Sequence, residues 1–151
     1  MRLITRRTKA GRLFLIGVFL FGLSGCGIFV SHYDAGAYQY FTSLKAYHLK
    51  FLDDYQAGPG KSFDPAKVGS TCDTGDLKFR EARAYADGKS DKTRVNAVDI
   101  LNNVFKKNCS LLLEQKRLFG VGYAKEQAAD AAKNYDLAIH GEASRVGGKA
   151  K

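Results

Sequence analysis

The sequence contains little of what enzymes and metal sites use. Its 151 residues include three histidines, three cysteines and no tryptophan. His32, His48 and His140 lack the close spacing of zinc ligands, such as two histidines separated by three residues. No two cysteines form a Cys-x-x-Cys motif, and no serine lies in a Gly-x-Ser-x-Gly motif. The sequence therefore predicts no catalytic residue, no metal site and no bound cofactor.

The remaining polar candidates favour structural roles. His48 falls on an apolar helical stripe, as a core or boundary histidine does. Asp53 and Asp54 are adjacent, and neighbours on a helix point in different directions, so the pair is poorly placed for acid–base work. Gly120 and Gly122 lie too close together for a phosphate-binding loop and follow no predicted strand.

No segment alternates apolar and polar residues with a period of two, which argues against a sheet. Apolar residues instead recur three and four positions apart. In a first helix predicted for residues 33–57, the core stripe comprises Ala37, Phe41, Leu44, His48, Phe51 and Tyr55. We therefore predict an all-α fold, an antiparallel bundle of three or four helices.

Three further helices are expected. After one short helical turn opened by Asp64-Pro65, a second helix should be capped by Asp73 or Thr74 and run to about Asp87. A third should follow the cap Asp91 and end near residue 116. A turn at residues 118–123 should precede the last helix, which is predicted for about residues 124–145.

The N-terminus carries a different pattern. Residues 13–26 read Leu-Phe-Leu-Ile-Gly-Val-Phe-Leu-Phe-Gly-Leu-Ser-Gly-Cys and contain no charge. Five basic residues and no acidic residue precede this run, namely Arg2, Arg6, Arg7, Lys9 and Arg12. A basic segment, an apolar segment and small residues at a cleavage point define a secretory signal.

The ending Leu23-Ser24-Gly25-Cys26 resembles the lipobox of bacterial lipoproteins. The resemblance implies a diacylglyceryl group on the Cys26 sulfur, cleavage before Cys26 and acylation of the new amino group. It divides the chain into a signal peptide (1–25), a lipidated tether (26–32), a helical domain (33–146) and a disordered tail (147–151). In this family an Asp after the cysteine favours the inner membrane, so Gly27 favours the outer membrane if the source has two.

An uncleaved transmembrane anchor is the alternative, because the uncharged run is about as long as a membrane span requires. Several glycines and a serine crowd its second half, which argues against it. Both interpretations keep the basic N-terminus in the cytoplasm and export everything after Cys26.

More than half of the net charge of +9 comes from the predicted signal peptide. Removing the five positive charges of residues 1–25 leaves +4, which is ordinary for a small domain. This value and export argue against a nucleic-acid partner. The C-terminal basic residues, Arg145, Lys149 and Lys151, are most simply a solvated tail.

If Cys26 is lipidated, Cys72 and Cys109 remain in an oxidising compartment, where an even number suggests a disulfide. A reversal of the chain at residues 88–90 would bring both to one level of an antiparallel hairpin. Two unpaired cysteines are the alternative.

Tyrosine is concentrated in the first predicted helix, which holds five of the eight in the chain. One core stripe cannot hold them all, and aromatic residues are enriched at partner interfaces. Tyr38 lies off the stripe and is the candidate for a partner surface. The alternative is ordinary amphipathic packing with hydroxyls at the water boundary.

These patterns predict a lipoprotein held at the membrane, facing the periplasm, that acts as a structural or protein-interaction module and is not an enzyme. Its expected partners are the membrane and an envelope protein. The alternatives are a small periplasmic enzyme acting on envelope polymers or a carrier of an apolar ligand. The exported part also resembles small helical bacterial lipoproteins in general pattern, without a motif that assigns a residue.

Overall fold

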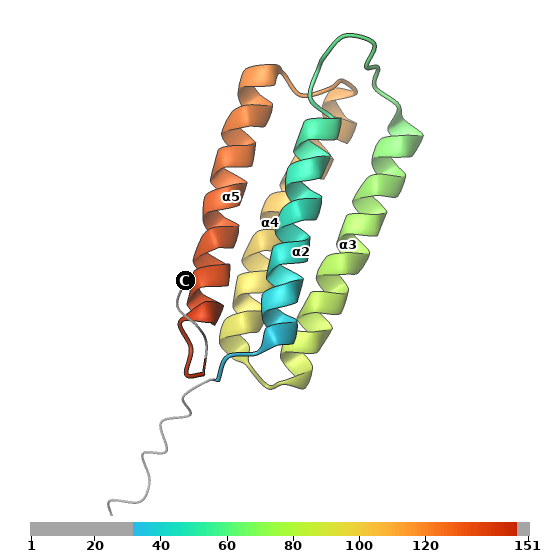
Figure 1. Ribbon diagram of the computed structural model, residues 1–151. Helices are drawn as coiled ribbons and strands as arrows, with labels where there is room; N and C mark the ends of the chain where they lie inside the picture. Colours follow the sequence, from blue (N-terminus) through green and yellow to red (C-terminus); the bar gives the residue numbers. More distant parts are fainter. Residues whose placement is uncertain (1–31, 148–151) are drawn as a thin grey trace, which may run out of the picture. The chain divides into compact units, whose positions relative to one another are not determined.

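A computed structural model describes residues 32–147. Cys26 and the predicted signal peptide lie outside the described residues. The described part folds into four helices that run alternately up and down (Figure 1). They are α2 (Ala35–Asp54), α3 (Pro65–Gly88), α4 (Lys92–Gln115) and α5 (Val121–Ala143). The predicted all-α bundle is therefore confirmed.

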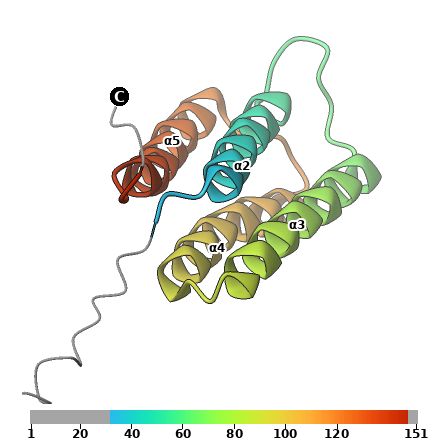
Figure 2. The same ribbon diagram turned by 60° about the horizontal axis from the view of Figure 1, so that its bottom comes forward.

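The helices form two layers, with α5 beside α2 and α4 beside α3 (Figure 2). Helix α2 also packs on α3, whereas α4 and α5 touch each other over a smaller area. One end of the bundle contains the start of α2, the turn between α3 and α4 and the end of α5 (Figure 1). This arrangement places residues far apart in sequence at one end of the domain, which we call the entry end because the chain enters the domain there at His32.

Aspartates begin three of the helices. The carboxylate of Asp34 accepts hydrogen bonds from the amides of Gly36 and Ala37, at 2.8 and 3.1 Å. Asp91 likewise accepts from the amide of Arg94 at 3.0 Å. Such caps satisfy amide groups that have no partner within the helix. The predicted cap at Asp91 is confirmed.

The predicted start of the second helix is wrong. Helix α3 begins at Pro65, with Asp64 as its cap, and continues without a break to Gly88. Pro65 occupies the first helical position, where its missing amide hydrogen costs nothing. Gly75 is buried inside the helix. A Cβ there would overlap the ring of Phe105, so glycine allows α3 and α4 to approach closely.

Smaller differences occur at the ends of two other helices. Helix α2 stops at Asp54 instead of residue 57, because Ala57 donates its amide hydrogen to the Phe119 carbonyl at 2.8 Å. Helix α5 starts at Val121, inside the predicted turn, and ends at Ala143. Beyond it, the carbonyl of Val146 accepts from the amide of Tyr33 at 3.0 Å, which draws the chain away from the helix axis.

The core lies between the two layers and is rich in aromatic rings. All six residues of the predicted α2 stripe are buried. Phe105 of α4 contacts rings of α2 and α3, including Phe51 at 5.1 Å and Phe79 at 5.4 Å between centroids. Cys72 and Cys109 form the predicted disulfide between α3 and α4, with Cα atoms 6.0 Å apart. The reversal at residues 88–90 brings them to one level, as expected.

Candidate functional site at the entry end of the bundle

The predicted lipidation site, Cys26, lies outside the described residues, so its modification remains a prediction. Within residues 32–147, no group of three histidine, cysteine or acidic side chains is arranged to hold a metal ion. The adjacent carboxylates of Asp53 and Asp54 are both exposed, and Asp54 pairs with Lys50 one helical turn away at 2.8 Å. These two acids therefore occupy a solvated helix face.

His48 is completely buried within a network of neutral groups. Asn108 of α4 donates from Nδ2 to the imidazole Nε2 at 3.1 Å, so the other ring nitrogen carries the hydrogen and faces the Tyr135 hydroxyl at 3.3 Å. Burial lowers the pKa of His48 to about 4, because the charged form would lose its hydration. Burial likewise raises the pKa of Tyr135. We call these three residues the neutral network; they join α2, α4 and α5 inside the core.

The tyrosines of α2 divide into two groups. Tyr47 and Tyr55 face α3, where their hydroxyls donate to the carbonyls of Thr71 and Lys67 at 2.6 and 3.1 Å. Their arrangement follows the alternative of amphipathic packing. Tyr38, the predicted partner residue, is instead half-buried beside Tyr33, with ring centroids 6.2 Å apart.

Charged side chains at the ends of all four helices, together with the hydroxyl of Tyr85, meet at the entry end. We call this set the end cluster: Asp34, Tyr85, Lys89, Asp91, Arg94, Glu142 and Arg145. Arg94 lies at its centre, buried to 5% exposure, and faces Glu142, which is buried to 2%. Its Nε and Nη2 donate to the two oxygens of that carboxylate at 2.9 and 2.7 Å. The planar fork of arginine matches a carboxylate in this two-bond geometry.

Further bonds extend the cluster to the other helix ends. Arg94 Nη1 lies 3.0 Å from the Asp91 carboxylate, which also accepts from Arg145, two residues after the end of α5. The hydroxyl of Tyr85 donates to Asp34 at 2.7 Å. Three acids thus meet three bases, and the set has no formal net charge.

The pKa values follow from these contacts. The hydrogen bond to Glu142 raises the pKa of Arg94, although burial acts against this. Burial would raise the pKa of Asp34, but hydrogen bonds from Tyr85 and from backbone amides, together with the charge of Lys89, lower it overall. Both groups are therefore held in their charged forms at neutral pH.

The cluster also holds the start of the described chain. Arg94 Nη2 donates to the carbonyl of His32 at 2.7 Å, and the amide of Asp34 donates to Glu142 at 2.7 Å. Between these two contacts, Tyr33 pairs with the backbone of Val146. The three residues before α2 are therefore fastened to α4, to α5 and to the segment after α5.

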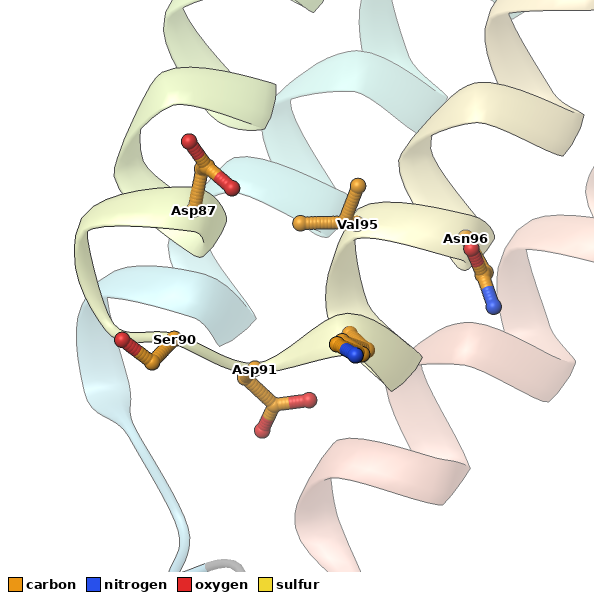
Figure 3. A pocket seen from close by; sticks show the side chains of 6 residues that line it. Asp87, Ser90, Asp91, Val95 and Asn96 are labelled. Atoms are coloured by element: carbon orange, nitrogen blue, oxygen red, sulfur yellow. The ribbon is translucent and has the colours of Figure 1, made fainter.

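Two surface pockets adjoin the cluster. One pocket, of about 330 Å³, lies at the α3–α4 turn (Figure 3). It is lined by Asp87, Ser90, Asp91, Lys92, Val95 and Asn96. Figure 3 shows the carboxylates of Asp87 and Asp91 on opposite sides of this turn. The Asp91 carboxylate pairs with two arginines, Arg94 and Arg145, and accepts from the amide of Arg94.

A second pocket, of about 220 Å³, forms a groove between α4 and α5 over Phe41 of α2. Its α5 wall includes Leu137, which is 66% exposed and is the most exposed large apolar side chain described. Arg94, Glu142 and Arg145 also line the groove. An exposed apolar side chain beside polar residues is a common feature of contact surfaces.

Sequence reasoning did not find Arg94 and Glu142, although a signal existed. Arg94 lies on the apolar stripe of α4, four and seven residues before Val98 and Leu101. Glu142 lies seven residues after Tyr135 on the core face of α5. Charges of opposite sign on two core-facing stripes indicate a buried ion pair.

Comparison with protein-family models, with curated proteins and with solved structures found no match to this chain. Among residues 32–147, none of the helices is long and apolar enough to cross a membrane.

Proposed function

We propose that this chain is an exported bacterial lipoprotein whose helical domain is held at an envelope membrane by acyl chains on Cys26. In this proposal the domain faces the periplasm and acts as a structural or protein-interaction module. The outer membrane is favoured where the source has two membranes. The lipobox-like sequence at residues 23–26 supports the anchor, and the compact helical fold is compatible with the role of a module.

One observation carries the proposal furthest, namely the fastening of His32, Tyr33 and Asp34 to the end cluster. A tether is effective only if the point where it joins the domain does not fray. Chain ends are normally poorly ordered unless contacts hold them. Here the residues six to eight positions after Cys26 contact a buried ion pair shared by α4 and α5. A load on the lipidated cysteine would therefore be shared by the whole bundle.

The alternatives have less support. An apolar ligand carrier needs a pocket of a few hundred Å³ inside the bundle. A pocket between α2, α3 and α4 in the described part of the chain measures about 10 Å³. An enzyme needs an acid and a base that face one site, and the pocket at the α3–α4 turn lacks this arrangement. The two larger pockets open at the surface, where they suit contacts with another molecule.

The anchor is tested by metabolic labelling with an alkyne fatty acid, followed by separation of membranes from soluble periplasm. We expect the native chain to incorporate the label and to sediment with membranes. Cys26→Ala should lose both properties while its domain remains folded by circular dichroism. Label that persists in Cys26→Ala would contradict the proposal, and Ser24→Ala is the matched control.

The interaction role is tested by a photo-crosslinking amino acid placed in intact cells. At Leu137, in the α4–α5 groove, we expect a discrete adduct with an envelope protein that disappears when Cys26→Ala releases the domain. Leu77 of α3 is the control, because it is 49% exposed but does not line the groove. Equal adducts from both positions would indicate nonspecific proximity and would contradict a defined interaction surface.

A further inference from the structure

Tyr33 and Tyr38 differ from most other tyrosines of the described chain. Five of the others form hydroxyl hydrogen bonds inside the protein, namely Tyr47, Tyr55, Tyr85, Tyr123 and Tyr135. Within residues 32–147, the hydroxyls of Tyr33 and Tyr38 have no such partner, although their rings contact each other and both are half-buried. The pair thus presents two amphipathic rings with free polar tips at the surface.

The pair lies at the entry end of the bundle. Tyr38 belongs to the first turn of α2, and Tyr33 is bonded through its amide to Val146, which is 55% exposed. The start of α2 and the end of α5 lie side by side in both views (Figures 1 and 2). Two tyrosines and a valine therefore share one corner of the domain.

Covalent geometry limits how far this corner can be from Cys26. His32 follows Cys26 by six positions, and an extended chain spans at most about 3.3–3.6 Å per residue. His32 is therefore within roughly 20 Å of the proposed acylated cysteine. Because acyl chains place that cysteine at the lipid surface, the corner with Tyr33 and Tyr38 is the first described part of the domain to meet the headgroups.

We propose that Tyr33 and Tyr38 dock the domain on the headgroup region of the membrane that holds its lipid anchor. This inference rests on the anchor of the proposed function and adds a contact between the folded domain and lipid. Tyrosine suits this position because its ring enters the less polar layer while its hydroxyl stays hydrated. The end cluster beside the pair is balanced in charge, so docking depends on the rings and resists added salt.

The docked state has a defined orientation. The entry end, with the α3–α4 turn, faces the lipid, and the opposite end, which carries the connections α2–α3 and α4–α5, faces away (Figure 1). Phe63 lies in the α2–α3 connection and is half-buried. A probe at position 38 should therefore approach lipid, whereas a probe at position 63 should not.

The absence of tryptophan from the chain makes this test direct. Full-length Tyr38→Trp and Phe63→Trp proteins are produced in a lipoprotein-processing host and reconstituted into vesicles of phosphatidylethanolamine and phosphatidylglycerol containing headgroup spin-labelled lipid. Intact mass first confirms the acyl groups on each. We expect quenching of tryptophan fluorescence at position 38 to exceed that at position 63 several-fold, with little change in molar salt.

A second variant tests the pair without altering the probe ring. Tyr33→Trp with Tyr38→Ser should show weaker quenching than Tyr33→Trp alone, while the circular dichroism of both stays native. Two results for acylated protein would overturn docking but leave the anchor intact: equal quenching at positions 38 and 63, or a Tyr38→Trp probe equally open to acrylamide with and without vesicles. Protein whose mass shows no acyl group would overturn the anchor and, with it, this docking.

Discussion

Two buried polar groups of residues hold this bundle together in opposite ways. The neutral network around His48 lies inside the core and consists of uncharged side chains joined by single hydrogen bonds. The pair of Arg94 and Glu142 at the entry end is equally buried but fully charged and joined by two short bonds. A buried histidine avoids the cost of desolvating a charge by losing its proton, whereas a buried arginine remains charged and needs a partner of opposite charge.

The difference shows how each site responds to damage. A neutral network that loses one member leaves an unsatisfied dipole, which costs roughly 1–3 kcal/mol. A buried ion pair that loses one member leaves a charge without its partner, which costs about 3–5 kcal/mol. A single substitution in the Arg94–Glu142 pair should therefore lower the free energy of unfolding more than a single substitution in the neutral network. Replacing both partners of the ion pair by apolar residues should lower it less than replacing one.

The largest effect is expected for Arg94→Met. It removes both bonds to Glu142 and the bond to His32, and should lower the free energy of unfolding by about 3–5 kcal/mol. Urea unfolding followed by circular dichroism measures this loss. Arg83→Met is the control: the Arg83–Asp99 pair is exposed, with side chains 50% and 42% accessible, and should cost at most about 1 kcal/mol. Equal losses in the two variants would show that burial does not strengthen the pair.

The neutral network predicts a pH dependence. His48 has a folded pKa of about 4 against 6.5 for the free side chain, so the unfolded chain binds more protons between these values. The free energy of unfolding should therefore fall as pH drops from 6.5 to 4, by about 3 kcal/mol in total from this residue.

Unfolding measured across this pH range should show a shallower slope in His48→Gln than in the native chain. His140→Gln, which changes an exposed histidine, is the control and should keep the native slope. A His48→Gln protein with the native slope would assign the acid sensitivity to other groups, such as the carboxylate of Asp34, whose pKa is lowered in the fold.

The double substitution Arg94→Met with Glu142→Leu should destabilise the protein less than Arg94→Met alone, because no unpartnered charge remains in the core. Complete unfolding curves of the two single variants and the double variant give the coupling energy between the residues. Strict additivity of the two single losses would show that the two side chains do not stabilise each other.

The smallest effect is expected for Tyr123→Phe. The hydroxyl of Tyr123 donates a long hydrogen bond of 3.4 Å to the side-chain oxygen Oδ1 of Asn108, so its removal should cost about 0.5–1 kcal/mol. A shift in the midpoint of urea unfolding measures it. A loss of stability as large as that of Arg94→Met would mean that the bond from Tyr123 to the neutral network stabilises the fold as much as the charged pair does.

Much of the fold was readable from local patterns. The stripe of α2, the cap at Asp91 and the pairing of Cys72 with Cys109 follow from helical spacing and from the position of one turn. The predicted start of α3 at Asp73 or Thr74 was wrong, because the helix continues through Gly75. In a helix, glycine is tolerated where a neighbouring ring needs the space, and that neighbour, Phe105, lies 30 positions later.

By itself, the sequence determined that the domain is helical, near which residues α2 and α4 begin and which stripe of α2 faces inward, because these depend on neighbours within a few residues. It also supplied the lipobox-like segment on which the proposed anchor depends. Only the tertiary structure decided that Arg94 meets Glu142, that His32 and Tyr33 are fastened beside the end of α5, and that Tyr38 stays at the surface. The contacts of Arg94 with Glu142 and His32, and of Tyr33 with Val146, join residues 48 to 113 positions apart, and only the packing of whole helices brings such distant residues together.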